Sequence, residues 1–206
     1  MRRSVPAPDG GRAAGDDAPG MIKRTSLAAL AALTIMAPAA TAATPLTDHV
    51  AGPADLPGAT FTAQPHAVGL RAFAREHEKR VRELRRLGYR AAAESAFGVG
   101  RQPTMGFSLA IRMTDARAAR REARRLFRAN SEPEPGTRAS ALAVPGVEGA
   151  RGVLLSGRQD GLSLRAVEIV WTSGTVLHEL FLFGRRAAVR PPAMVSAAQA
   201  VDGRAG

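Results

Sequence analysis

Residues 162–184 constrain the fold more than any other part of this chain. Apolar, β-branched and aromatic residues are dense on both sides of Ser173-Gly174, a dipeptide that favours a tight turn. Two such runs separated by two turn residues are typical of a β-hairpin. With Ser173 and Gly174 as the loop, Glu168 is expected to lie directly opposite Glu179.

The second strand of this hairpin shows no clean alternation of apolar and polar residues. Leu177 and Phe181 fall on one face, while Leu180 and Leu182 fall on the other. Strands that are covered on both faces have this pattern. We therefore expect the hairpin to lie in the middle of a sheet, with helices or loops packed on both sides.

The N-terminal part has the pattern of a secretory signal peptide at residues 21–42. A positive segment at residues 21–24 precedes an apolar segment at residues 25–36, and Ala40-Thr41-Ala42 fits a cleavage site. An uncleaved anchor is the alternative, but the apolar run is shorter than the ~20 residues that a membrane span needs. We therefore expect cleavage, export, and no transmembrane span in the processed chain.

The remaining segments are assigned by composition. Residues 1–20 have no apolar period, and we expect them to be a disordered extension that arises from an incorrect gene start. Residues 43–58, rich in Pro and Gly, are predicted to be a flexible lead-in. Residues 59–201 then form a single α+β domain, and residues 202–206 form a tail.

Charge and cysteine content exclude several classes of site. The chain has 29 basic and 18 acidic residues, for a net charge of +11, and no cysteine. A thiol nucleophile, a thiolate metal site, a disulfide and a lipid attached to cysteine are therefore excluded. Lys23 and Lys79 are the sole lysines, so arginine serves as the ordinary surface cation and the net charge alone does not indicate nucleic acid.

One long helix is predicted at residues 70–87, ending at Gly88. Its apolar stripe has a period of 3.6 residues and consists of Leu70, Phe73, His77, Val81, Leu84 and Leu87. We interpret His77 as a core or boundary histidine, because the sequence offers it no ligand partners nearby.

The other expected elements are strands at residues 59–63, 104–113 and 153–156, a helix at residues 193–201 and a polar loop at residues 131–142. Residues 89–97 leave helix and strand open, since three alanines favour helix while Tyr89 and Phe97 favour strand. Together these elements predict an α+β fold with a mostly antiparallel sheet of five to six strands and two long helices packed on it.

A second helix, at residues 115–130, carries a candidate anion-binding surface. It is capped by Thr114 or Asp115, and its arginines are Arg117, Arg120, Arg121, Arg124, Arg125 and Arg128. Such a row could bind an anionic lipid or cell-wall polymer through charge alone, or it could be a solvated helix face. No aromatic residue is interleaved to stack on bases, so we do not expect a nucleic-acid partner.

The hairpin carries the weak candidates for catalysis: Glu168, Glu179 and His178. Two carboxylates opposed on an apolar face would repel one another, which raises the pKa of one of them as in paired catalytic acids. A three-residue loop would instead place Glu168 opposite His178, and Arg112 could neutralise the pair. We favour a structural role, and we expect no metal, because His178 and Glu179 point to opposite faces.

Enzyme motifs are absent from the sequence. Neither H-E-x-x-H nor G-x-S-x-G occurs, and the glycine-rich residues 98–103 and 144–152 lack the spacing of a dinucleotide or phosphate loop. No cofactor is expected.

The order of elements also resembles a known group. Leu56-Pro57-Gly58, Val144-Pro145-Gly146 and Gly149-Ala150-Arg151 are similar to segments of uncharacterised exported proteins from high-GC, actinobacterial-type genomes with a PsbP-like α/β fold. This resemblance implies an antiparallel sheet with helices packed on it, a binding or assembly role and no catalytic residues to carry over. The chain departs from the lipoprotein members of the group in having no cysteine.

We therefore expect an exported, non-enzymatic binding or assembly protein that acts at the cell envelope or outside it. Its partner would be an envelope protein, a lipid or an anionic cell-wall polymer. The alternatives are a hydrolase-like enzyme that uses Glu168 and Glu179, and an arginine-rich binder of anionic polymer or nucleic acid.

Overall fold

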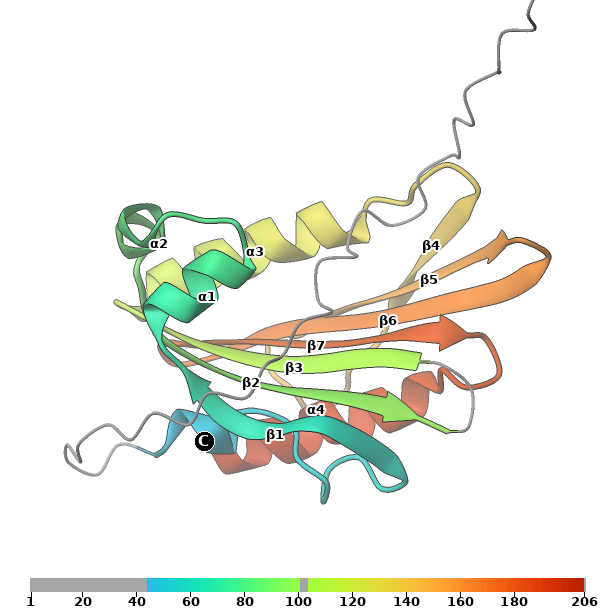
Figure 1. Ribbon diagram of the computed structural model, residues 1–206, viewed down its shortest axis with the longest axis horizontal. Helices are drawn as coiled ribbons and strands as arrows, with labels where there is room; N and C mark the ends of the chain where they lie inside the picture. The colour runs from blue at the N-terminus through green and yellow to red at the C-terminus, as the bar shows by residue number, and fades with distance from the viewer. Residues whose placement is uncertain (1–43, 101–103, 206) are drawn as a thin grey trace, which may run out of the picture.

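The structure is a computed structural model that describes residues 44–100 and 104–205 (Figure 1). The predicted signal peptide and the extension before it lie outside the described residues. Within the described residues, none of the helices combines the length and the apolar character that crossing a membrane requires.

A single antiparallel sheet forms the centre of the molecule. The elements in chain order are the 3₁₀ helix η1 (Leu46–His49), β1 (Ala59–Val68), α1 (Leu70–Glu76), α2 (Val81–Leu87), β2 (Tyr89–Val99), β3 (Thr104–Met113), α3 (Ala116–Ser131), β4 (Thr137–Leu142), β5 (Arg151–Gln159), β6 (Leu162–Ser173), β7 (Val176–Arg185) and α4 (Pro191–Ala205). The seven strands follow the order β1-β2-β3-β7-β6-β5-β4. The central strand is β7, and β6 lies beside it.

The predicted fold class is wrong in its strand count, because the sheet has seven strands rather than five or six. The polar segment that was predicted as a loop contains β4, which pairs with β5 at the edge of the sheet. Its four middle residues are exposed. An edge strand with little buried surface does not show the apolar alternation by which strands are recognised in a sequence.

The prediction of two long helices is also wrong. The first of them is two helices of seven residues, α1 and α2, and Glu78 between them has the left-handed φ of +51°. The amide of Lys79 donates to the carbonyl of Ala74 and closes α1. Phe73 and Leu84, one from each helix, enter the same hydrophobic cluster. The apolar period continues across the break, so the sequence gives no sign of it.

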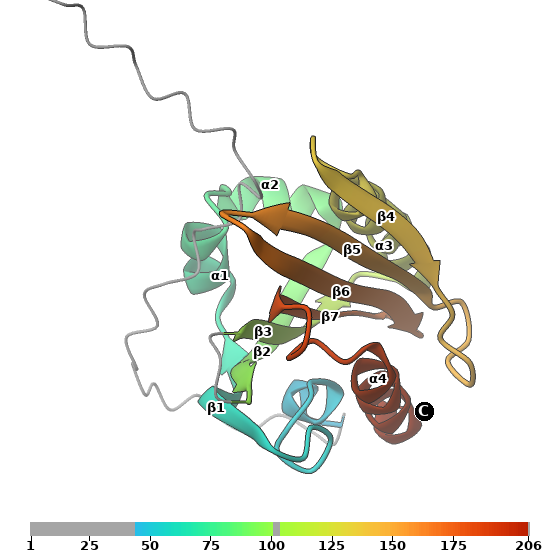
Figure 2. The same ribbon diagram turned by 90° about the vertical axis from the view of Figure 1, so that its right-hand side faces the viewer.

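Helices cover both faces of the sheet, as Figures 1 and 2 show. On one face α1, α2 and α3 pack over a core that includes Ile111 and Leu177. On the other face α4 packs over a core that includes Trp171, Leu180 and Met194. Because β7 is covered from both sides, most of its residues are apolar on both faces, as expected for a strand in mid-sheet.

The segment before β1, predicted as a flexible lead-in, packs against the second face. Val50 and Ala51 are fully buried, and the Ala51 amide donates to the hydroxyl of Ser108 at 2.9 Å. The guanidinium of Arg204 on α4 forms an ion pair with Asp55. The lead-in and the C-terminal helix are therefore tied to each other.

The turn of the β6–β7 hairpin lies one residue later than predicted. The loop is Gly174-Thr175, and Ser173 pairs with Val176. Gly174 has a φ of +58°, and the first position of a two-residue hairpin loop requires this positive φ, which glycine adopts at little cost. The register shifts accordingly, so Glu168 lies opposite Phe181 rather than opposite Glu179.

Candidate functional site

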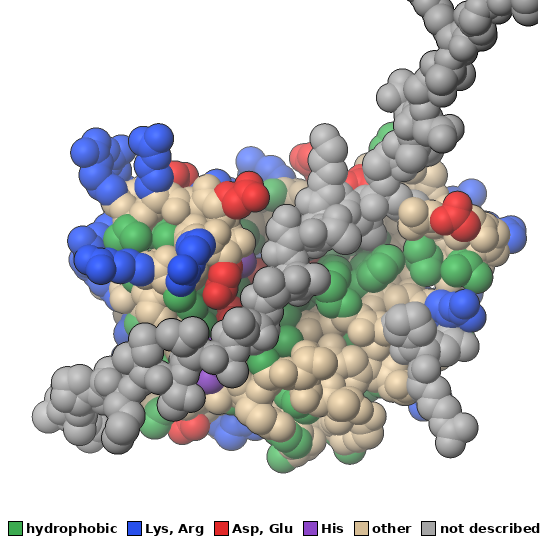
Figure 3. Space-filling model, viewed as in Figure 1, with side chains coloured by type: hydrophobic (Ala, Val, Ile, Leu, Met, Phe, Trp, Pro, Cys, Tyr) green, Lys and Arg blue, Asp and Glu red, His purple; other side chains and the backbone are tan. Residues whose placement is uncertain are grey.

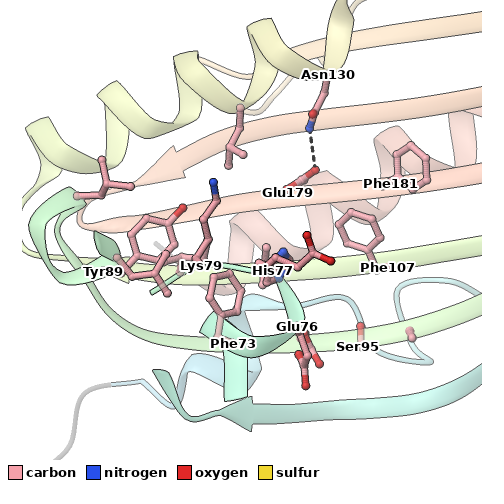
Figure 4. Close-up of a pocket in the computed structure, with 18 of the residues that line it drawn as sticks. Phe73, Glu76, His77, Lys79, Tyr89, Ser95, Phe107, Asn130, Glu179 and Phe181 are labelled. Carbon is pink, nitrogen blue, oxygen red and sulfur yellow. Dashed lines mark hydrogen bonds between the residues drawn. The ribbon is translucent and has the colours of Figure 1, made fainter. Parts of the chain in front are cut away.

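A cavity of about 530 Å³ lies between the sheet and the layer formed by α1, α2 and α3 (Figure 4). Much of its wall is apolar, and the described residues of this wall include Phe73, Phe107, Leu109, Ile111, Leu126 and Phe181. Phe107 and Phe181 from neighbouring strands stack with their ring centroids 5.2 Å apart. A cavity of this size, with a mainly apolar lining, has the dimensions of a small-molecule site.

Charged side chains line another part of the cavity, and most of them are acidic. The described acidic residues are Glu76, Glu78, Glu83, Glu94 and Glu179, and the described cationic ones are Lys79 and Arg125. Figure 3 shows Lys and Arg gathered at the end of this face where α1 and α2 lie, with acidic and hydrophobic side chains beside them. The cavity therefore carries the opposite sign of charge to the chain as a whole.

The structure brings Glu168 and Glu179 onto one face of the sheet as diagonal neighbours. Glu168 lies opposite Phe181, and Glu179 lies opposite Val170. The amide of Asn130 at the end of α3 donates to both, to Glu168 at 2.7 Å and to Glu179 at 3.2 Å. The two carboxylates are 1% and 5% exposed, and of the two Glu179 alone is among the described residues that line the cavity.

His178 points to the opposite face and is separated from both glutamates. Its ring stacks on Trp171 with the centroids 4.6 Å apart, and its Nδ1 is 3.1 Å from the carbonyl oxygen of His49. Burial lowers its pKa to about 3, so the ring is neutral at pH 7. Arg112 also points away, and donates to the carbonyl of Thr44 at 3.3 Å. Neither residue joins the glutamates in a site.

Sequence reasoning missed a hydrogen-bond network around the buried Glu122, which includes the lining residues Tyr89 and Arg125. The hydroxyl of Tyr89 donates to Glu122 at 2.6 Å, and Arg125 donates to both oxygens of Glu122 at 2.8 and 2.5 Å. Burial opposes the charge on Glu122, but the bonds from Arg125 and Tyr89 outweigh it and hold its pKa below the ordinary value. The i,i+3 spacing of Glu122 and Arg125 is visible in the sequence, whereas Tyr89 is distant along the chain.

Replacing Glu122 with glutamine is expected to lower the free energy of unfolding by about 1.5–3 kcal/mol, the usual contribution of a hydrogen bond to a charged group. The pKa of Glu122 is depressed in the folded state, so this stability is present above about pH 4.5 and is lost as pH falls through the folded pKa. Urea denaturation of the unchanged chain and of Glu122→Gln at pH 7 and pH 3 measures this difference in unfolding free energy. The exposed Glu132 provides the control variant Glu132→Gln; equal stabilities of the two variants at pH 7 would contradict the prediction.

The predicted anion-binding arginines all lie on α3, capped by Asp115, whose carboxylate accepts from the amide of Ala118 at 2.7 Å. The side chains of Arg117, Arg120, Arg121, Arg124, Arg125 and Arg128 are exposed. Arg125 also binds Glu122, so it is held against the cavity wall. A role of this surface in anion binding stays a prediction. Among residues 44–100 and 104–205, no group of three His, Asp or Glu side chains could hold a metal ion.

Comparisons with known proteins show no family for this chain. No family model matches it, and no curated protein matches it. The crystal structure of the extracellular domain of PknH from Mycobacterium tuberculosis matches with a TM-score of 0.49 and 11% sequence identity, over 74% of this chain and 88% of that chain. The PsbP-like resemblance has no counterpart in these comparisons. The fold is α+β with a cavity under its helical layer.

Proposed function

We propose that this chain is a non-enzymatic binding protein whose ligand, a mainly apolar small molecule, enters the cavity between the sheet and α1, α2 and α3. The observation that carries this proposal is the cavity itself, about 530 Å³ in volume with an apolar wall of Phe107, Leu109 and Phe181. Apolar cavities of this size with a few polar groups are the usual sites for small ligands.

A binding role is supported over hydrolysis by the surroundings of the two glutamates. Paired catalytic carboxylates must both reach the substrate within hydrogen-bond distance. Glu168 is 1% exposed and is bridged to Glu179 through the Asn130 amide. One amide that donates to both carboxylates is typical of a structural pair, since it gives each buried carboxylate a hydrogen bond without a substrate.

An address outside the cytoplasm forms part of the proposal. It is supported by the signal-peptide pattern of residues 21–42. A protein in that compartment that binds an apolar molecule would shield it from water at or outside the cell envelope. In this proposal, the binding role expected from the sequence is performed by the cavity between the sheet and α1, α2 and α3.

Nile red, a neutral dye whose fluorescence rises in apolar surroundings, tests the proposal with the full chain. We expect saturable binding that Ala96→Trp weakens at least tenfold. Ala96 is half-buried on the cavity side of β2, opposite Phe107, so an indole there occupies the cavity. Ala139 on β4 is exposed, and Ala139→Trp is the matched control that leaves binding unchanged.

Ala63→Phe gives a second test from a different strand, since Ala63 on β1 also lines the cavity. Circular dichroism establishes that each variant is folded before the dye is added. Equal dye affinity in both cavity variants and in the control would show that the dye binds elsewhere and would overturn the proposal.

A further inference from the structure

We propose that the ligand is a cationic amphiphile, with an apolar tail against Phe107 and Phe181 and an ammonium group beside Glu76 and Glu94. This inference rests on the proposed function and names the chemical class that the cavity selects. It is carried by the charge of the lining and by the arrangement of charged and apolar groups along the cavity.

The lining is acidic in a chain whose net charge is +11. Its two described cations are each matched by a carboxylate. The ammonium nitrogen of Lys79 is 3.8 Å from Glu83, and Arg125 is bound to Glu122, which lies outside the described lining. Glu76 and Glu94 add negative charge that no third cation of the described lining offsets.

Glu76 and Glu94 lie close enough to repel one another. Burial raises the pKa of Glu94, and the charge of Glu76 raises it further, while His66 acts in the opposite direction from 3.5 Å. The side chain of Glu94 is only 13% exposed, so water screens this repulsion incompletely. A ligand cation between the two carboxylates would be attracted by both and would relieve their repulsion.

The groups are arranged as an amphiphile requires. In Figure 4, Glu76 and His77 lie near Phe73, while Phe107 and Phe181 lie together farther along the sheet. The Phe73 ring packs on His77 with the centroids 4.1 Å apart. Glu76 therefore lies apart from the apolar pair Phe107 and Phe181, as the head group and the tail of an amphiphile require.

An anionic amphiphile fits the same cavity less well. Lys79 and Arg125 are the described lining cations that could bind its head group, but Glu83 already pairs with Lys79 and Glu122 with Arg125. Glu76 and Glu78, which precede Lys79 in the chain, also line the cavity. A carboxylate head group would therefore enter a field of its own sign.

Three ligands with the same ten-carbon alkyl tail separate the head groups: decyltrimethylammonium, undecanoate and decanol. Each is titrated into the full chain below its micelle concentration or, for decanol, below its solubility limit, and binding is followed by calorimetry. We expect the cation to bind at least tenfold tighter than the other two. Glu76→Gln, at an exposed position, should weaken binding of the cation three- to tenfold and leave binding of decanol unchanged. Glu148→Gln, in the exposed β4–β5 loop, is the matched control and should change neither.

The other outcomes overturn the inference in recognisable ways. Tightest binding of undecanoate would assign the head group to the lining cations Lys79 and Arg125, and equal binding of all three would show that the cavity does not recognise a head group. In both cases the cavity still binds ligand, so the proposed function stands. If none of the three binds and Nile red is not taken up, the proposed function itself fails.

Discussion

Replacing Trp171 with alanine is expected to lower the free energy of unfolding by about 3–5 kcal/mol, the usual cost of removing a large aromatic residue from a core. Trp171 is 1% exposed and is among the largest fully buried side chains. It packs in the cluster that joins β6 to α4. Its indole N–H donates to Asp202 at 3.0 Å, so the variant also removes a tie between the sheet and the C-terminal helix.

Urea denaturation followed by far-UV circular dichroism measures the loss, because Trp171 is the chain's single tryptophan and its fluorescence disappears with it. Leu162→Ala, at a position 43% exposed near the start of β6, is the matched large-to-small control and should cost far less. A loss below about 1 kcal/mol for Trp171→Ala would mean that the indole contributes little packing to the core.

The central part of the sheet could be predicted from the sequence because its signals are local. Residues 104–113 alternate strictly and form β3 with the predicted bounds, and the two-faced apolar pattern of β7 indicates its place in mid-sheet. The edge of the sheet could not be predicted, since β4 buries little and its residues carry no apolar period. Tertiary contacts decide such strands, whereas intrinsic preferences are weak.

The break between α1 and α2 shows the same limit for helices. Helix propensity and periodicity are satisfied on both sides of Glu78, and the left-handed residue at that position is not one that a sequence rule selects. The turn of the hairpin was predictable in kind but was misplaced by one residue. The requirement for glycine at the first loop position would have corrected it.

The candidate site was only partly accessible to sequence reasoning. Glu168 and Glu179 lie on one face of the sheet in both the predicted and the observed register. The two registers differ by an even number of residues, and such a shift leaves each side chain on the same face. The bridging amide of Asn130 comes from another element, and the cavity depends on how α1, α2 and α3 sit over the sheet. Contacts between elements far apart in the chain have no local signature.

His178 is expected to make the protein acid-sensitive. The ring is fully buried, and burial, partly opposed by the hydrogen bond with the His49 carbonyl, lowers its pKa from 6.5 to about 3 in the folded state. The folded pKa is the lower one, so between about pH 6.5 and pH 3 His178 is protonated in the unfolded chain but not in the folded chain. As the pH decreases, the free energy of unfolding therefore falls by up to about 1.4 kcal/mol per pH unit, and by roughly 4 kcal/mol between pH 6.5 and pH 3.

Unfolding free energies of the full chain and of His178→Phe, measured in urea from pH 7.5 to pH 4, isolate this contribution. Phenylalanine keeps an aromatic ring against Trp171 but cannot be protonated. The stability of His178→Phe at pH 7 also reflects the lost bond to His49, so the readout is the slope of unfolding free energy against pH. The slopes that carboxylates contribute are common to both chains and cancel in the difference.

His178→Leu repeats the comparison without a ring. Parallel pH profiles for all three chains would show that His178 is as easily protonated in the folded protein as in the unfolded one, which its burial against Trp171 and His49 forbids.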